Sequence, residues 1–440
     1  MATTYLQSDF AGTGSATGAK ATYSFWVKPA VKDDRSTFVS GYSDGNNYMK
    51  FRFANDALTF YGNHSSSNNL NIETNRKFRD PAAWYHIVLQ VDTTSAVSSD
   101  RVKLYVNNEQ QTSFANSTYP SQNDPLYLTS QDDVQIGAFN NTEHFDGQMS
   151  QFYCIDGTLY APSTFAETDS TSGFWIAKTS VSVTYGSKGY FLKFASGSPY
   201  ADSSGNSNDF TLGAGTITSL KDTPDNNFCT MNPLDNYYFG GTFTNANNTT
   251  ESPSSTYAMC TSTLGMASGK YYAEAKLQAG YPQLKFGITS KPAWTSNQTM
   301  SFSGSTCYSG SDGTLVLDGV TTTGWGSTFS VGDIIGIAVD CDNNKIYFSV
   351  NGTWQNSANP SAGTGSETIV APSTTDTGNY YFSWSDNKTD GGSTMQYNFG
   401  QGYFGTTAVS TAGTNASNNG TFEYDVPTGF TALSTEGLNT

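Results

Sequence analysis

The sequence predicts an all-β protein of two antiparallel β-sandwich domains. Along most of the 440-residue chain, short runs recur in which apolar residues alternate with polar ones, and their apolar members are largely β-branched or aromatic. Clusters of Gly, Asn, Asp and Ser separate these runs, and no convincing helical periodicity is present. Regularly spaced short strands bounded by such turns are typical of sandwiches.

Five runs show the strand pattern most clearly. They cover residues 23–27, 48–53, 84–91, 102–106 and 345–350. The fourth run is followed at once by Asn107-Asn108, and the fifth by Asn351-Gly352. Two-residue hairpin turns favour these residues because the turn backbone needs positive φ angles. We therefore expect each of these two strands to begin a hairpin.

A shift in composition divides the chain. Residues 199–235 are rich in turn-forming residues, so we place one sandwich at 1–198, a connector at 199–235 and a second sandwich at 236–440. Each sandwich is long enough to bury a core of its own. No short repeat or heptad indicates a fibrous shaft, which favours a compact protein over a long fibre.

Composition excludes several classes of protein. Lys and Arg number 21 and Asp and Glu 37, so the net charge is −16, and aromatic residues reach 14%. A chain with so many aromatic residues is not disordered, because these residues favour a packed core. A net negative charge without a basic block argues against nucleic-acid partners, because binding to phosphates needs positive charge. No run of 18 apolar residues predicts a transmembrane helix, and the first ten residues do not resemble a signal peptide.

The reactive residue types show no catalytic or zinc-binding pattern. Five widely spaced cysteines predict buried, reduced thiols: Cys154, Cys229, Cys260, Cys307 and Cys341. His86 is expected to pack or hydrogen bond within its strand, and His64 and His144 to be solvated. No Ser-His-Asp pattern and no phosphate-binding glycine loop are found, so we assign no catalytic residue and no cofactor.

Paired carboxylates were sought because glycan hydrolases need two of them close together. The nearest patterns are Glu167-x-Asp169 and Glu423-x-Asp425, which we interpret as turns. Residues 202–208 superficially resemble a calcium loop, but Gly213 stands where an EF-hand needs a glutamate. No residue is assigned to a metal, although calcium stays an open alternative.

Two domain resemblances follow from the motifs. The first half resembles a laminin-G or concanavalin A-like jelly roll, in which a Trp-containing strand, a W-x-H strand and a Y-V-N hairpin precede I-G and F-x-G-x-M motifs. Its motifs are residues 23–29, 84–92, 102–108, 136–138 and 145–152.

The second half resembles a SPRY domain. Its motifs are residues 269–275, 286–288, 331–340 and 345–354.

The connector and the end of the chain resemble structural proteins of tailed bacteriophages, through residues 202–210, 222–228 and 424–433. This resemblance implies a non-enzymatic structural protein on the virion surface, made in the host cytoplasm, either a capsid decoration or a head or tail appendage. Expected partners are other virion proteins and a host glycan or protein, with a homo-oligomer as an open alternative. A glycan-cleaving enzyme and a free lectin-like module on the same fold are the competing hypotheses.

Ligand contacts are expected from aromatic residues in the turn-rich stretches of the second half, because rings stack on sugars and supply rigid contact area. The candidates are Trp294, Tyr308 and Trp325. The alternative for each is a satellite core residue beneath a long loop. Net acidity favours neutral or cationic partners over phosphorylated ones.

Overall fold

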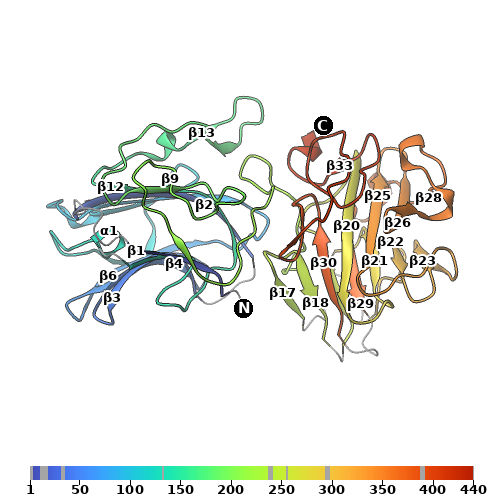
Figure 1. Ribbon diagram of the computed structural model, residues 1–440, viewed down its shortest axis with the longest axis horizontal. Helices are drawn as coiled ribbons and strands as arrows, with labels where there is room; N and C mark the ends of the chain where they lie inside the picture. Colours follow the sequence, from blue (N-terminus) through green and yellow to red (C-terminus); the bar gives the residue numbers. More distant parts are fainter. Residues whose placement is uncertain are drawn as a thin grey trace. The chain divides into compact units, whose positions relative to one another are not determined.

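The computed structural model describes residues 3–9, 18–30, 35–130, 133–235, 241–253, 256–292, 298–386 and 392–439. The chain forms two compact units, Met1–Ser219 and Leu220–Thr440. Each unit is built mainly from two antiparallel sheets (Figure 1), which confirms the predicted fold class. In the described ranges the one α-helix is α1 (Tyr127–Ser130), a single turn.

The predicted connector is divided between the two units. Its first part includes β16 (Thr211–Ala214), which pairs with β1 (Tyr5–Asp9) in the first unit. Phe228, from its second part, lies in the core of the second unit. Residues 199–235 are therefore built into both sandwiches.

The first unit has an eight-stranded and a six-stranded sheet. The larger sheet has the order β10 (Phe114–Thr118), β6 (Ser67–Lys77), β5 (Ala57–His64), β4 (Asn47–Ala54), β3 (Arg35–Asp44), β11 (Asp133–Ile136), β1 and β16. The smaller sheet has the order β15 (Tyr190–Leu192), β12 (Gly147–Asp156), β2 (Lys20–Pro29), β7 (Tyr85–Asp92), β8 (Val102–Val106) and β9 (Glu109–Gln111).

Aromatic side chains fill the space between these sheets. Phe25 of β2 stacks on Phe152 of β12 at 4.6 Å between ring centroids, and meets Phe38 of β3 at 5.3 Å. Phe51 of β4 meets Phe38 edge-on at 5.5 Å. All four rings are fully buried, and such burial stabilises the fold by about 1.5–3 kcal/mol for each ring. Because strand side chains alternate between faces, the same strands present their polar residues outward.

The outer face of the six-stranded sheet is covered by a segment that contains the hairpin β13 (Ala166–Thr168) and β14 (Trp175–Ala177) (Figure 1). Trp175 packs there with Trp26 of β2 and with Trp84, which directly precedes β7. His86 of β7 lies in the same cluster, stacked on Trp26 at 4.7 Å between ring centroids. The segment that contains β13 and β14 therefore buries His86.

Two hydrogen bonds fix the protonation of His86. The Trp175 indole donates to His86 Nδ1 at 3.0 Å, so this nitrogen carries no proton, and His86 Nε2 then donates to Ser24 Oγ at 2.9 Å. Complete burial lowers the pKa of His86 to about 3. His86 is thus a neutral packing residue, as its strand position predicted.

The second unit also pairs two sheets. The larger has the order β17 (Thr242–Thr244), β18 (Thr249–Glu251), β30 (Thr394–Asn398), β20 (Lys270–Ala279), β25 (Ile334–Asp340), β26 (Lys345–Val350) and β27 (Thr353–Trp354), with β28 (Glu367–Thr368) on β26 and β33 (Thr431–Ala432) on β20. The smaller has the order β19 (Ala258–Thr261), β29 (Tyr381–Asp386), β21 (Lys285–Thr289), β22 (Ser305–Ser309), β23 (Thr314–Leu317) and β24 (Val320–Thr322).

Short elements lie outside these sheets. The hairpin of β31 (Tyr403–Phe404) and β32 (Thr407–Ala408) precedes the end of the chain. Single 3₁₀ turns are η1 (Ser98–Asp100), η2 (Pro162–Thr164), η3 (Gln355–Ser357), η4 (Pro360–Ala362), η5 (Pro372–Thr374) and η6 (Gly437–Asn439). Both predicted hairpin turns are present, with positive φ at Asn107, Asn108, Asn351 and Gly352.

A buried carboxylate ties the C-terminal segment to β20. Glu274 accepts hydrogen bonds from the backbone amides of Glu423 and Tyr424 at 2.9 and 2.8 Å, and from the side chains of Tyr272 and Asn398. Burial raises the pKa of Glu274 to about 7, although these four donors oppose the rise. β33 then pairs in parallel with β20, so the end of the chain is part of the second core.

The buried His86 makes the first unit sensitive to acid. Its pKa is lowered on folding from 6.5 to about 3, so the unfolded chain binds a proton more readily and stability is lost as the pH falls below 6.5. We expect a loss of about 1.4 kcal/mol for each pH unit in this window. The variant His86→Gln should show a shallower loss in urea unfolding measured from pH 7.5 to pH 4. An identical slope in both proteins would contradict this assignment.

Candidate functional site

Aromatic side chains gather on the outward face of the eight-stranded sheet. Tyr42, Tyr48 and Tyr61 lie on β3, β4 and β5, and Phe139 follows β11; all four are half-buried, and we call them the aromatic patch. Tyr48 lies 6.4 Å from Tyr42, 6.2 Å from Tyr61 and 4.9 Å from Phe139 between ring centroids. The rings therefore form one continuous surface across three strands.

Two asparagines border the patch. Asn63 is paired with Tyr48, and Asn71 with Tyr61, so the sheet register places each amide beside a ring on the same face. The Oδ1 atoms of both asparagines are buried, and neither has a hydrogen-bond partner among the described residues. An unmet buried acceptor costs about 1–3 kcal/mol, so these two oxygens lower the stability of the free protein.

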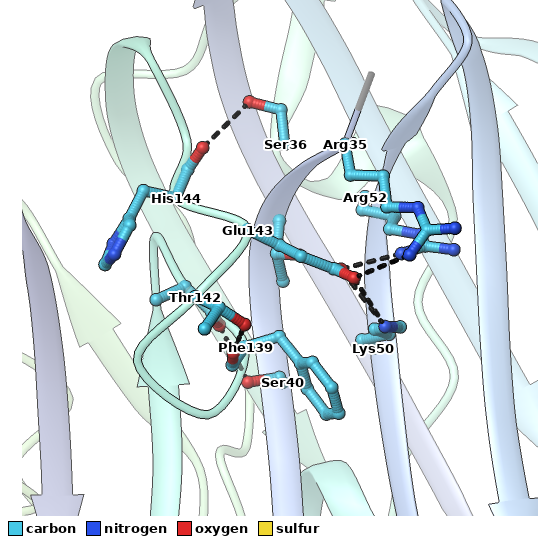
Figure 2. Close-up of polar contacts among 11 residues, drawn as sticks. Arg35, Ser36, Ser40, Lys50, Arg52, Phe139, Thr142, Glu143 and His144 are labelled. Carbon is cyan, nitrogen blue, oxygen red and sulfur yellow. Dashed lines mark hydrogen bonds and ion pairs between the residues drawn. The ribbon is translucent and has the colours of Figure 1, made fainter. Parts of the chain in front are cut away.

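Three cations surround one carboxylate beside the patch (Figure 2). Arg52 Nη1 lies 2.6 Å from Glu143 Oε2, Lys50 Nζ lies 3.1 Å from the same oxygen, and Arg35 Nη1 lies 3.4 Å from Oε1. We call Arg35, Lys50 and Arg52 the cation cluster. The side chains of Lys50 and Arg52 are 6% and 9% exposed and that of Arg35 is 62% exposed. Glu143 therefore forms ion pairs with two buried cations.

The cations also contact the aromatic patch. Lys50 Nζ lies 3.9 Å from the ring centroid of Phe139, 5.6 Å from that of Tyr48 and 5.8 Å from that of Tyr61. Such cation–π contacts are worth about 0.5–2 kcal/mol each. Burial and the neighbouring Arg52 lower the pKa of Lys50 to about 8, against the attraction of Glu143. The patch and the cation cluster are thus one continuous site.

Glu143 remains ionised in this arrangement. Burial by itself would raise the pKa of its carboxyl group, but the charges and hydrogen bonds of Arg52 and Lys50 outweigh that effect and lower it. A carboxylate held in this way cannot act as a general acid near neutral pH.

The loop that carries Glu143, residues 137–146, is strained. Asn140, Asn141 and Glu143 have φ angles of 45°, 58° and 50°. Asn140 and Asn141 form a two-residue turn between Phe139 and Thr142, where positive φ is favoured, whereas the left-handed conformation of Glu143 costs about 1–3 kcal/mol. Gln135 holds the loop through its side chain, which accepts from Asn141 N at 3.1 Å and donates to Asn141 Oδ1 at 2.9 Å. We call residues 137–146 the Glu143 loop.

The two remaining histidines are half-buried, which corrects the prediction that both are solvated. Figure 2 shows the His144 ring directed away from the cation cluster, and this ring lies 5.8 Å from that of Tyr5. His64 Nδ1 lies 2.5 Å from the hydroxyl of Tyr127, which donates to Asn47 Oδ1. Neither histidine adjoins a nucleophile suited to catalysis.

Two of the three predicted ligand contacts, Tyr308 and Trp325, lie among the described residues. Trp294 lies outside the described residues. Tyr308 is fully buried, donates its hydroxyl to the carbonyl of Ser327 and packs on Trp325 and Phe348, both at 5.6 Å. Tyr308 is therefore a core residue beneath a loop, and its prediction as a ligand contact is wrong. Trp325 is half-buried, and its indole donates to Glu367 at 2.7 Å.

The carboxylates considered for catalysis or calcium are used within turns. Asp169 accepts from Ser172 N at 2.6 Å, and Asp425 accepts from Thr414 N at 2.7 Å. Asp202 accepts from three backbone amides, including those of Ser204 and Asn208, so this loop is closed by its own hydrogen bonds.

The described residues were also compared with the requirements of a metal site, a disulfide bond and a membrane-spanning helix. No cluster of three or more His, Cys, Asp or Glu side chains that could hold a metal ion occurs among the described residues. The five cysteines are buried and form no disulfide bond. Within the same part of the chain, no helix has the length and apolar character needed to cross a membrane.

The aromatic patch was not predicted, because its tyrosines lie on strands whereas ligand contacts were expected in turn-rich stretches. A signal was present in residues 48–53, where Tyr48, Lys50 and Arg52 alternate with core residues and must therefore share one face. No sequence pattern linked Glu143 to these positions.

We expect Glu143→Gln to destabilise the first unit by about 3 kcal/mol, because it leaves buried cations without a counter-charge. Urea unfolding measures the loss, and hydrogen exchange should rise in the Glu143 loop. The matched control is Glu109→Gln, which removes a carboxylate that is 75% exposed and paired with Arg76. That change should cost at most about 1 kcal/mol. Equal effects of the two substitutions would contradict the role of Glu143.

Comparisons with known proteins identify both sandwiches. Residues 2–163 match the concanavalin A-like lectin/glucanases superfamily, and residues 270–364 match the SPRY domain. No curated protein sequence shows significant similarity to the chain.

Similar solved structures are distant in sequence. The SPRY domain of human HERC1 is 16% identical, with 38% of this chain and 96% of that one covered and a TM-score of 0.29. Domain 4 of AbnA, an extracellular GH43 arabinanase from Geobacillus stearothermophilus solved with arabinotriose, is 19% identical, with 34% and 65% covered and a TM-score of 0.26. A heptameric SAP-like pentraxin from Limulus polyphemus is 16% identical, with 42% and 89% covered and a TM-score of 0.28. The chain thus contains a concanavalin A-like domain followed by a SPRY domain.

Proposed function

We propose that this protein is a non-enzymatic binding protein that recognises a saccharide on the outward face of its first sandwich. The observation that carries the proposal is the aromatic patch, with its half-buried rings beside two unmet amide acceptors. Aromatic rings stack on the apolar faces of sugars, while amide oxygens accept hydrogen bonds from sugar hydroxyls.

The sheet makes this surface rigid before any ligand binds. Neighbouring strands lie about 4.8 Å apart, so rings on β3, β4 and β5 span roughly the width of two sugar residues. Tyr42, Tyr48 and Tyr61 come from paired strands whose inward side chains are core residues. Little ordering is needed when a ligand binds, which favours affinity.

The carboxylates support a binding role over a catalytic one. Retaining glycosidases need two carboxyl groups about 5–5.5 Å apart, one of which takes up and gives back a proton. Glu143 is held ionised by cations, and Asp169 and Asp425 cap turns. A glycan-cleaving enzyme that uses other carboxylates is the competing hypothesis.

The proposed setting is the surface of a tailed-phage particle. Its support lies in the connector and C-terminal segments that resemble phage structural proteins and in a composition poor in charge. In this proposal the chain is made in the host cytoplasm, the second sandwich contacts other virion proteins and the first contacts the host. Cryo-electron microscopy of purified particles tests it: we expect density for the protein at a symmetric position, and its absence from intact particles would overturn the virion role.

We expect Tyr48→Ala and Tyr61→Ala each to weaken saccharide binding about tenfold, because each removes a stacking ring worth about 1.4 kcal/mol. A glycan array with the full chain identifies the ligand, and calorimetry then measures its affinity. Tyr200→Ala is the matched control, because Tyr200 is 40% exposed and lies outside the patch. Unchanged affinity in both patch variants would place the binding site elsewhere.

A further inference from the structure

The cation cluster carries more positive charge than its partner neutralises. Arg35, Lys50 and Arg52 face the single carboxylate of Glu143, which leaves two positive charges uncompensated within the cluster. This excess lies in a chain of net charge −16. Because charges beyond about 8 Å are largely screened at physiological salt, the local excess decides which groups the site attracts.

Glu143 also uses the guanidinium of Arg52 incompletely. A carboxylate that fits an arginine fork accepts two parallel hydrogen bonds. Arg52 donates to Glu143 through Nη1 alone, and Arg52 Nε is buried with no hydrogen-bond partner among the described residues. The side chain of Arg52 is nine-tenths buried, so water does not readily replace the missing acceptor. A free carboxylate could bind this fork through both oxygens.

Backbone strain offsets part of the stability that Glu143 provides. Glu143 itself is left-handed, with a φ of 50°, a conformation that costs such a residue about 1–3 kcal/mol. A carboxylate that arrives on a ligand does not require this conformation, so its binding would allow the backbone at Glu143 to relax. Lys50 and Arg52 would be paired with a carboxylate both before and after the ligand binds.

The cation cluster lies within reach of a substituent on a sugar that stacks on the aromatic patch. Phe139 belongs both to the Glu143 loop and to the aromatic patch, and Lys50 and Arg52 lie within 5.8 Å of the Tyr61 ring centroid. A pyranose carboxylate extends from the ring edge, so a sugar stacked on Tyr48 or Tyr61 would present it to these cations. Neutral sugars lack a group that could compete with Glu143.

We propose that the saccharide bound on the aromatic patch is acidic, and that its uronate carboxylate replaces the carboxylate of Glu143 in the cation cluster. This inference rests on the proposed saccharide-binding function. Glu143 then acts as an internal competitor that occupies the subsite until a ligand carboxylate displaces it.

The test compares an oligogalacturonate with its methyl ester, which has the same length and stereochemistry but no charge. Calorimetry with the full chain should show tighter binding of the acid than of the ester. In Glu143→Gln, the ratio of acid affinity to ester affinity should rise about tenfold, because only the acid competes with Glu143. Glu109→Gln is the charge-matched control and should alter neither affinity. Arg52→Lys keeps the charge but removes the fork, so it should weaken binding of the acid.

A second measurement uses the unmodified protein and does not depend on the folding of a variant. Saturating oligogalacturonate should increase amide exchange in the Glu143 loop and decrease it in β4 and β5. Equal binding of acid and ester with an unchanged loop would overturn the displacement while leaving the proposed function in place. No binding of neutral or acidic saccharides by any of these proteins would overturn both.

Discussion

The outward face of the first sandwich depends on the ion pairs that Glu143 makes with two buried cations. Lys50 and Arg52 are less than one-tenth exposed, and an isolated charge in such surroundings costs several kcal/mol. Their shared carboxylate removes most of that cost. Because the same carboxylate lies on a strained loop, the ion pairs also fix the Glu143 loop and, with it, the position of Phe139. One electrostatic requirement therefore organises both the charged and the aromatic parts of the site.

The inner faces of the sheets make this arrangement possible. Phe51 and Phe53 of β4 lie in the core, so the two-residue period of the strand places Lys50 and Arg52 on the opposite face. A shift of one residue in register would exchange these faces and bury both cations in the core. The cost of that shift specifies the register, and the register aligns Tyr42, Tyr48 and Tyr61 across three strands.

The strands could be predicted from sequence because their signals are local. The alternation in residues 102–106 and 345–350 marks β8 and β26 with their observed bounds, and the turns at Asn107 and Asn351 follow from the demand for positive φ. The Glu143 ion pairs could not be predicted, since Lys50 and Glu143 are 93 residues apart and no periodic pattern connects them. The burial of Tyr308 was hidden for the same reason: its packing partner Phe348 is distant in sequence.

A structure of the full chain with a bound saccharide tests the central claim, that the outward face of the eight-stranded sheet is the binding surface, most directly. The account predicts a sugar ring stacked on Tyr48 or Tyr61, with hydroxyls bonded to Asn63 or Asn71. A saccharide bound beside Trp325 in the second sandwich, with the aromatic patch vacant, would contradict it. The same structure would show whether Glu143 or a ligand carboxylate occupies the cation cluster.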